Sequence, residues 1–198
     1  MNDLPLILAS ASPRRRELLG GAGIAFEVMP ADIFEHEPCG EEPGDFARHL
    51  ATEKALAVAR RVGSPPRRRV LGADTIVVVD GAILGKPRDA RHAEELLARL
   101  VGREHEVITA VALATSDTLA VRTTAVATRV RMRRATAEDL RAYVATGEPL
   151  DKAGAYAIQG EGRRFVEEVA GSESNVIGLP VEETLALLRA VDRDAPEP

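Results

Sequence analysis

The chain has 198 residues, with 26 lysines and arginines against 31 aspartates and glutamates, so its formal charge is −5. This length gives one compact domain or two small lobes enough core to fold without disulfides or structural zinc, and the single cysteine, Cys39, excludes an internal disulfide framework. The acidic balance and few aromatic residues argue against a general nucleic-acid binder, no stretch is apolar enough to span a membrane, and we expect a reducing, cytoplasmic location.

Short apolar strands alternate with helical periodicity, which predicts an α/β fold. In chain order the first predicted elements are a strand at 5–11, a helix from Pro13 to Gly20, a strand at 26–30 and a helix at about 46–62. A strand at 70–79 follows, with a hairpin turn at Asp80-Gly81 into 82–84, and then a helix capped by Asp89 that stops at Gly102. The last predicted elements are strands near 106–114 and 119–132, a helix from Thr136 to about Ala145, a strand at 165–169 and a helix at 181–189. Residues 70–79 are β-branched and apolar on both faces, as is typical of a central strand. No linker clearly divides the chain, so we expect a single bilobed domain over 1–191 and a frayed tail at 192–198.

Three arginines, Arg14 to Arg16, occupy the first turn of the helix that begins at Pro13. A helix amino terminus favours acidic residues by about 0.3–1 kcal/mol each, so cations there are explained if an anion binds to the backbone amides and the guanidinium groups. The alternative is a solvated surface cluster, which suits Arg16 best.

Asp74 lies inside the apolar strand at 70–79 and is followed by the hydroxyl of Thr75. Burial of an ionised carboxylate costs several kcal/mol unless a metal, a cation or good hydrogen bonds compensate. Asp74 therefore either forms a structural salt bridge at a strand end or has a function, such as binding a divalent cation or accepting a proton from water.

Two further segments carry candidate ligand-binding residues. Lys86 lies in a turn that the hairpin brings back toward the strand of Asp74, but its spacing is not that of a phosphate loop, and a solvated loop lysine is the alternative. Residues 148–160 have little bulk, which leaves room for a ligand, and the Gln159 amide can read the edge of a base. The same stretch is also consistent with a tight crossing between elements.

The remaining candidates have weaker patterns. The histidines are scattered without the spacing of metal ligands, so we expect surface or satisfied core positions for them. They are His36, His49, His92 and His105. Alternating arginines over 129–133 predict an exposed strand face, with RNA contact as the alternative.

Several motifs together resemble one known family. In order they are residues 8–15 (LASASPRR), 72–75 (GADT), 84–89 (LGKPRD), 109–111 (TAV), 151–160 (DKAGAYAIQG) and 175–180 (NVIGLP). Over almost its whole length the chain resembles the Maf family of nucleoside triphosphate pyrophosphatases. The resemblance implies an elongated mixed sheet flanked by helices, with two lobes around a central cleft, similar to the inosine triphosphate pyrophosphatases. It also implies a homodimer, which is frequent in the family.

The resemblance also implies a reaction and a site. Family members hydrolyse a nucleoside triphosphate between its α and β phosphates with a divalent metal, and this chain is similar to the dTTP and UTP subgroup at residues 13–15, 74–75 and 158–159. By the resemblance Asp74 accepts the proton, the base is selected by Arg14, Thr75 and Gln159, and Glu35 belongs to the pocket. The other pocket residues that it implies are Ser10, Arg15, Lys54 and Lys86. Our mechanistic hypothesis is that Asp74, with Glu35, holds Mg²⁺ or Mn²⁺. Where the family usually has an acidic pair, this chain has Phe34-Glu35.

The charges agree with a polyphosphate substrate. A triphosphate brings about four negative charges, which Arg14, Arg15 and Lys86 can neutralise together with a metal. Three alternatives stay open: a pyrophosphatase for 7-methyl-GTP or another modified nucleotide, a nucleotide-binding regulator of cell division, and an RNA-binding module that uses residues 129–133. Asp74 and Glu35 disfavour a pure sensor, which needs no carboxylate facing the phosphates.

Overall fold

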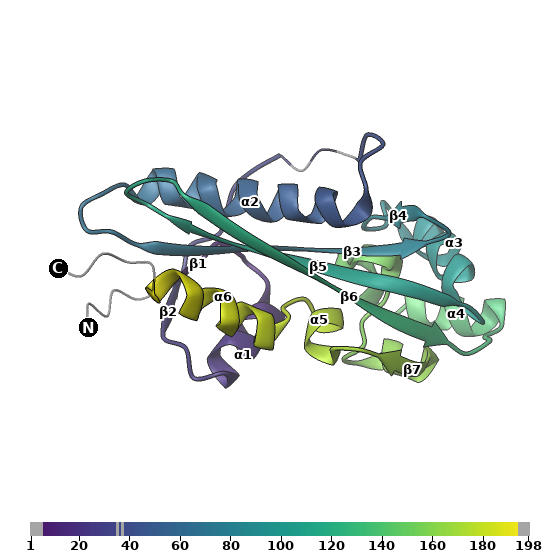
Figure 1. Ribbon diagram of the computed structural model, residues 1–198. Helices are drawn as coiled ribbons and strands as arrows, with labels where there is room; N and C mark the ends of the chain where they lie inside the picture. The colour runs from purple at the N-terminus through teal and green to yellow at the C-terminus, as the bar shows by residue number, and fades with distance from the viewer. Residues whose placement is uncertain (1–5, 35, 37, 194–198) are drawn as a thin grey trace. The chain divides into compact units, whose positions relative to one another are not determined.

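The computed structural model describes residues 6–34, 36 and 38–193, with residues 192 and 193 described by their backbone only. The strands form one mixed, seven-stranded sheet flanked by helices, as predicted (Figure 1). The strands are β1 (Leu6–Leu8), β2 (Phe26–Val28), β3 (Arg69–Val79), β4 (Ala82–Leu84), β5 (Glu104–Thr115), β6 (Val121–Met132) and β7 (Val166–Ala170). The helices are α1 (Pro13–Gly21), α2 (Pro43–Val62), α3 (Ala90–Leu100), α4 (Ala137–Val144), α5 (Glu173–Ile177) and α6 (Val181–Arg193), with short 3₁₀ helices η1 (Glu148–Asp151), η2 (Ala153–Ala155) and η3 (Glu161–Phe165).

The strand order is β2-β1-β3-β5-β6-β7, and β4 also pairs with β3. β1 runs parallel to β2 and β3, whereas β4 is antiparallel to β3 and β7 is antiparallel to β6. β3 has a neighbour on each side and is buried along nearly its whole length. The central position predicted for residues 70–79 is therefore confirmed.

Capping side chains explain where three of the helices begin. Ser12, Asp89 and Thr136 each accept a hydrogen bond from the backbone N–H three residues later, at the starts of α1, α3 and α4. Pro13 follows the cap of α1, where its missing N–H costs nothing, and Asp139 completes a capping box with Thr136. These starts are the ones that the sequence predicts.

The turn between β3 and β4 has the predicted hairpin geometry. Asp80 and Gly81 both take positive φ, of 51° and 74°. Val79 pairs with Ala82 across the turn. Two consecutive positive φ values match the right-handed twist of the strands, which is why Asp-Gly is favoured there.

The chain divides into two compact units, each with its own apolar core. Unit 1 comprises Met1–Asp74, Thr109–Val126 and Gly178–Pro198, and unit 2 comprises Thr75–Ile108 and Ala127–Ile177. The unit 1 core includes Leu6, Leu8, Leu19, Leu71, Leu113, Leu179 and Leu188. The unit 2 core includes Val79, Leu84, Leu97, Leu100, Met132, Tyr143, Tyr156 and Phe165.

The structure differs from the predicted elements at the ends and in one loop. α6 continues to Arg193, past the predicted end at 189, and residues 194–198 of the predicted tail lie outside the described residues. α5 was not predicted, because five residues show too little periodicity. The small-residue stretch at 148–160, for which no helix was predicted, contains the short 3₁₀ helices η1 and η2. Within the described ranges, no helix has both the length and the apolar character needed to cross a bilayer.

Candidate active site

A close approach of helix α2 to strand β3 shapes the interior of unit 1. A Cβ atom on Gly72 would stand 2.3 Å from the carbonyl oxygen of Ala51 and 2.7 Å from the backbone nitrogen of Ala55. No side chain fits at such distances, so a glycine on the strand and alanines on the helix let the two backbones meet. Lys54 lies between these alanines in the helix and is buried. The helix is thereby seated with Lys54 against β3.

Lys54 and Asp74 form a buried ion pair across this contact. The Nζ atom of Lys54 lies 2.6 Å from Oδ1 of Asp74, and the two side chains keep 11% and 10% of their exposure. Each charge offsets the desolvation of the other, so removing one partner would leave an uncompensated charge in the interior. The compensating partner that the sequence demands for Asp74 is therefore Lys54, 20 residues earlier in the chain.

The two oxygens of Asp74 have different surroundings. Oδ1 accepts the hydrogen bond from Lys54. Within the described part of the chain, nothing donates a hydrogen bond to Oδ2. The structural salt bridge of Asp74 is therefore present, and one acceptor oxygen remains for water, a cation or a ligand, so the functional role of this residue stays a prediction.

The segment between β1 and α1 forms the second part of the site. Backbone pairing continues past β1 to Ala9, whose N–H donates a hydrogen bond of 2.8 Å to the carbonyl oxygen of Leu71 on β3. β1 and β3 are parallel, and Leu8 pairs with Leu71. Ser10, which follows Leu8, therefore lies toward the same end of the two strands as Asp74, which follows Leu71. Ligands commonly bind at this carboxyl end of parallel strands. The Ser10 hydroxyl accepts hydrogen bonds from the Ser12 N–H at 3.3 Å and from the Arg15 guanidinium at 3.2 Å.

The three arginines of α1 have different partners. Arg15 donates from Nε to the carbonyl oxygen of Gly178 at 2.8 Å and is fixed by that bond and by Ser10. Arg14 is half-buried and has no hydrogen bond or ion pair within the described ranges of the chain. Arg16 is exposed, as expected. Since the first turn holds no acidic residue, Arg14 is a cation at a helix amino terminus without a counter-charge there, which suits an anionic ligand.

The other candidate substrate residues belong to unit 2. Thr75 is half-buried on β3, and Lys86 and Gln159 are exposed. The N–H of Gly154 donates to the carbonyl oxygen of Gly85 at 3.1 Å. This bond joins the turn of Lys86 to the segment that carries Gln159, although the two are far apart in sequence.

Glu148 fastens the loop that carries Gln159. Its Oε1 accepts hydrogen bonds from the Tyr143 hydroxyl at 2.7 Å and the Gly162 N–H at 3.0 Å, and its Oε2 accepts one from the Glu161 N–H at 3.0 Å. Burial opposes the ionisation of Glu148, but these bonds outweigh it and hold the pKa of the carboxyl below its ordinary value. Glu148 therefore acts as a structural anchor, and sequence reasoning missed this role.

His105 on β5 holds the same loop from the core of unit 2. Its Nε2 lies 2.8 Å from the hydroxyl of Tyr156, and both rings are buried. Burial lowers the pKa of His105 to about 4, so the imidazole is neutral at pH 7. Its Nδ1 is buried without a hydrogen-bond partner in the described chain, so the prediction of a satisfied core position holds for one ring nitrogen only.

The histidines of unit 1 also depart from expectation. His36 and His49, expected as scattered residues, come together with Glu53 on the amino-terminal half of α2. The only signal in the sequence was the i, i+4 spacing of His49 and Glu53 on one helix face. His36 joins them from the preceding loop, which no local pattern predicts.

The two expected metal ligands are only partly placed. Glu35 lies outside the described residues, and Asp74 offers its Oδ2 atom. Hard cations such as Mg²⁺ and Mn²⁺ take carboxylate oxygens. The donor chemistry of Asp74 therefore fits such an ion.

Comparison with known proteins gives the fold class first. The chain is similar in fold to a HAM1 protein from Coxiella burnetii, with a TM-score of 0.52 at 18% identity over 97% of this chain and all of that one. Sequence relatives include proteins named dTTP/UTP pyrophosphatase from Anaeromyxobacter dehalogenans, 54% identical over 93% of this chain and 92% of the relative, and from Methylococcus capsulatus, 51% identical over 94% and 91%. The family model for Maf-like proteins matches residues 5–191, and the chain belongs to this family.

Proposed function

We propose that this protein hydrolyses dTTP and UTP to the nucleoside monophosphate and pyrophosphate. The observation that carries the proposal is the buried ion pair of Lys54 with Asp74, in which one carboxylate oxygen accepts no hydrogen bond from the described residues. The names of relatives at 51% and 54% identity support the same activity and the same substrates.

Asp74 is the proton acceptor in the proposed reaction. Lys54 fixes the orientation of the carboxylate through Oδ1 at 2.6 Å, while Oδ2 is available to a water molecule. A positioned base contributes about 10²–10⁴-fold to such a step. As Asp74 takes a proton from the water molecule, the water oxygen attacks the α-phosphorus in line with the leaving oxygen. The water oxygen ends in the nucleoside monophosphate, and pyrophosphate departs.

The amino-terminal turn of α1 binds phosphate oxygens in this proposal. Backbone N–H groups at a helix start and the guanidinium of Arg14, which has no partner among the described residues, are suited to an anion. Arg15 and Ser10 hold one another and keep the turn in place. Lys86, exposed in unit 2, adds a further cation for the pyrophosphate part.

A divalent cation, Mg²⁺ or Mn²⁺, belongs to the proposal. Oδ2 of Asp74 would hold it through one lone pair and keep the other to accept the proton, and Glu35 is the second ligand that we expect. Such an ion, when bound, neutralises phosphate charge and makes the phosphorus more susceptible to attack. The protein's own contribution at this point is a carboxylate that Lys54 already orients.

Thr75 and Gln159 select the base, together with Arg14. A glutamine amide carries one donor and one acceptor, and uracil and thymine offer the complementary carbonyl and imide groups. Glu148 and His105 act indirectly, because they fix the loop that presents Gln159.

Two expectations about the setting of the enzyme belong to the same proposal. The free, exposed thiol of Cys39 favours a reducing compartment, such as the cytoplasm. We expect a homodimer because the family resemblance implies it.

The test is a parallel assay of pyrophosphate and orthophosphate release. dTTP, UTP, CTP and 7-methyl-GTP are each incubated with the protein and Mg²⁺ or Mn²⁺. We expect pyrophosphate from dTTP and UTP, with both metals removed as the negative control. Orthophosphate as the first product would contradict the bond assignment, and preferred turnover of 7-methyl-GTP would contradict the substrate assignment.

A further inference from the structure

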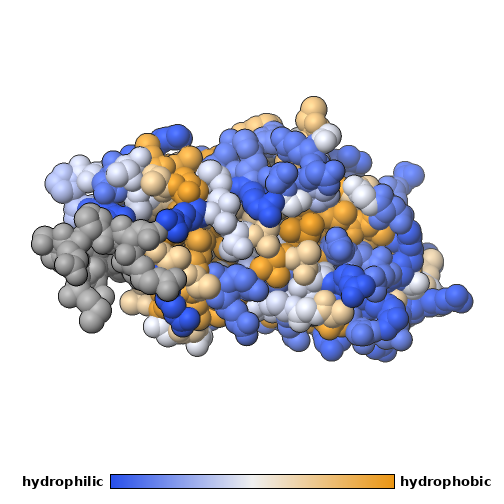
Figure 2. Space-filling view, viewed as in Figure 1, coloured by the Kyte–Doolittle hydropathy of each residue, from blue (hydrophilic) through white to orange (hydrophobic). Residues whose placement is uncertain are grey.

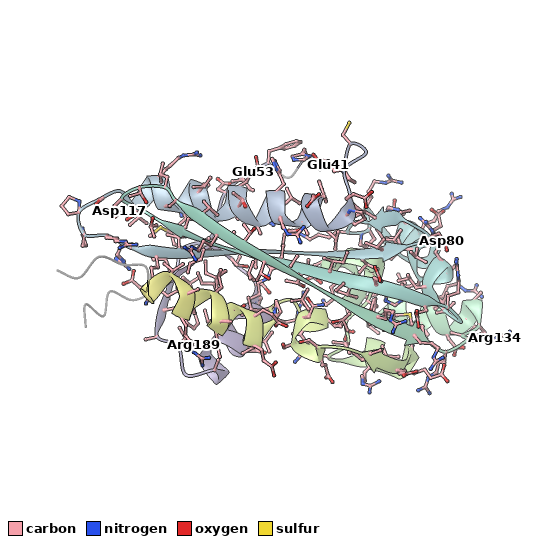
Figure 3. The ribbon with its side chains drawn as sticks, in the orientation of Figure 1. Glu41, Glu53, Asp80, Asp117, Arg134 and Arg189 are labelled. Carbon is pink, nitrogen blue, oxygen red and sulfur yellow. The ribbon has the colours of Figure 1, made fainter. Side chains whose placement is uncertain are left out.

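A second cluster of ligating side chains lies in unit 1 on helix α2. His49 and Glu53 are one helical turn apart, and His36 reaches them from the preceding loop, so that one ligand atom from each lies within 4.8 Å of the other two. Figure 3 shows Glu53 on the side of α2 that faces away from β3, whereas the neighbouring Lys54 is buried against Asp74. The cluster is therefore distinct from the Lys54–Asp74 pair.

The spacing of these side chains matches the coordination sphere of a small divalent ion. Nε2 of His49 lies 3.5 Å from Oε1 of Glu53. Two ligands at about 2.0–2.1 Å from one tetrahedral ion stand about 3.4 Å apart. The rings of His36 and His49 have their centroids 5.2 Å apart at an interplanar angle of 68°. Two imidazoles on one tetrahedral ion place their centres about 5 Å apart by the same geometry.

The surroundings hold the three side chains in place before any ion binds. The His36 ring packs edge-on against Phe46, with centroids 5.5 Å apart, and Phe46 is itself buried. His49 and Glu53 are fixed in register by the regular helix. Their own interaction is a weak surface contact between side chains that are 51% and 41% exposed, so an ion displaces little.

The site is also accessible to an ion from solution. The surface over the amino-terminal half of α2 is predominantly hydrophilic (Figure 2). His49 is exposed, and His36 and Glu53 are half-buried. Three protein ligands leave a fourth position for water, as in open zinc sites.

We propose that His36, His49 and Glu53 bind one borderline divalent transition metal, such as Zn²⁺, Co²⁺ or Ni²⁺. Imidazole nitrogen suits these ions, whereas Mg²⁺ is bound through oxygen, so the site discriminates against the cation of the proposed hydrolysis. The bound ion ties the segment before α2 to the helix. This binding stands apart from nucleotide hydrolysis, so its test does not depend on the proposed function.

The experiment is titration calorimetry with Zn²⁺ in excess Mg²⁺, on full-length protein without a histidine tag. We expect one ion per chain, and affinity reduced at least about tenfold in His36→Ala and in His49→Ala. The matched controls are His92→Ala, a histidine on α3, and Cys39→Ser, an exposed thiol that shares the segment of His36. Both controls should bind like the wild type.

A second measurement identifies the ligands directly. The Co²⁺-loaded protein should show the visible absorption of a nitrogen and oxygen site without a thiolate charge-transfer band. Equal weakening in His92→Ala, loss of binding in Cys39→Ser, or full affinity in His36→Ala and His49→Ala would overturn the assignment. Circular dichroism of each variant separates loss of a ligand from loss of the fold.

Discussion

Asp74 in unit 1 is buried and Glu148 in unit 2 is half-buried, and their oxygens are used differently. Lys54 donates to one oxygen of Asp74, and the other accepts no hydrogen bond from the described residues. Both oxygens of Glu148 are occupied, by one hydroxyl and two backbone N–H groups. A carboxylate with every oxygen occupied holds structure together, whereas one with an open oxygen in a compensated, buried pair is prepared for chemistry.

Gly72→Ala tests the packing that creates the Lys54–Asp74 pair. The new methyl group would meet a backbone oxygen of α2 at 2.3 Å, so the helix must move and the pair must separate. We expect the free energy of unfolding to fall by about 3 kcal/mol, with loss of pyrophosphate release. Denaturant titration provides the measurement. Gly21→Ala, in α1 with nothing within 4 Å of the new atom, is the control and should lose no stability.

Glu148→Ala tests the other side of the comparison. Removal of the carboxylate leaves the N–H groups of Glu161 and Gly162 without their acceptor, and we expect a loss of about 2 kcal/mol in unfolding free energy. Glu148→Gln retains one acceptor oxygen and should lose about half as much. Equal stability of both variants and the wild type would show that Glu148 does not anchor the loop.

His105 adds a pH dependence to unit 2. Its pKa is about 4 in the folded chain and about 6.5 when unfolded, so below pH 6.5 the unfolded chain takes up a proton that the folded chain does not. Stability should therefore fall with falling pH, by about 1–2 kcal/mol between pH 6.5 and 5 from this residue. In His105→Gln this component of the slope should disappear, while His92→Gln should keep it, as measured by urea unfolding at each pH.

The smallest expected effect among these predictions is on the KM for UTP, and it should distinguish Arg14 from Arg16. They lie in the same helical turn, but Arg14 is half-buried without a partner in the described chain and Arg16 is exposed. A charge-assisted contact is worth about 1.5–3 kcal/mol, so Arg14→Ala should raise the KM for UTP about tenfold or more. Arg16→Ala should stay within about twofold. Identical KM values for the two variants would remove Arg14 from the site.

Local patterns in the sequence predicted much of the fold, because the relevant interactions span only a few residues. The helix starts at Pro13, Asp89 and Thr136 and the Asp80-Gly81 turn each depend on interactions within four residues, and each predicted position is confirmed. The η2 and η3 segments and the short α5 were missed, because single turns carry no measurable periodicity.

The site could be predicted only in part, because its partners are brought together by tertiary packing. Asp74 stood out as a carboxylate in an apolar strand, but nothing local identifies Lys54 as its partner. That pairing depends on the close contact at Gly72, which seats α2 on β3. His36 and His49 similarly meet only after the loop folds back on the helix.

The most direct test of the account is single-turnover hydrolysis of UTP by Asp74→Asn, alongside its affinity for UTP. Asparagine keeps the shape and an oxygen for Lys54 but leaves that buried cation without its counter-charge, so the variant should be less stable, while the folded protein should still bind UTP within a few-fold. The rate of pyrophosphate formation should fall by at least about 10²-fold, because no base remains to accept the proton from water. Hydrolysis at the wild-type rate by the folded variant would contradict the role of Asp74.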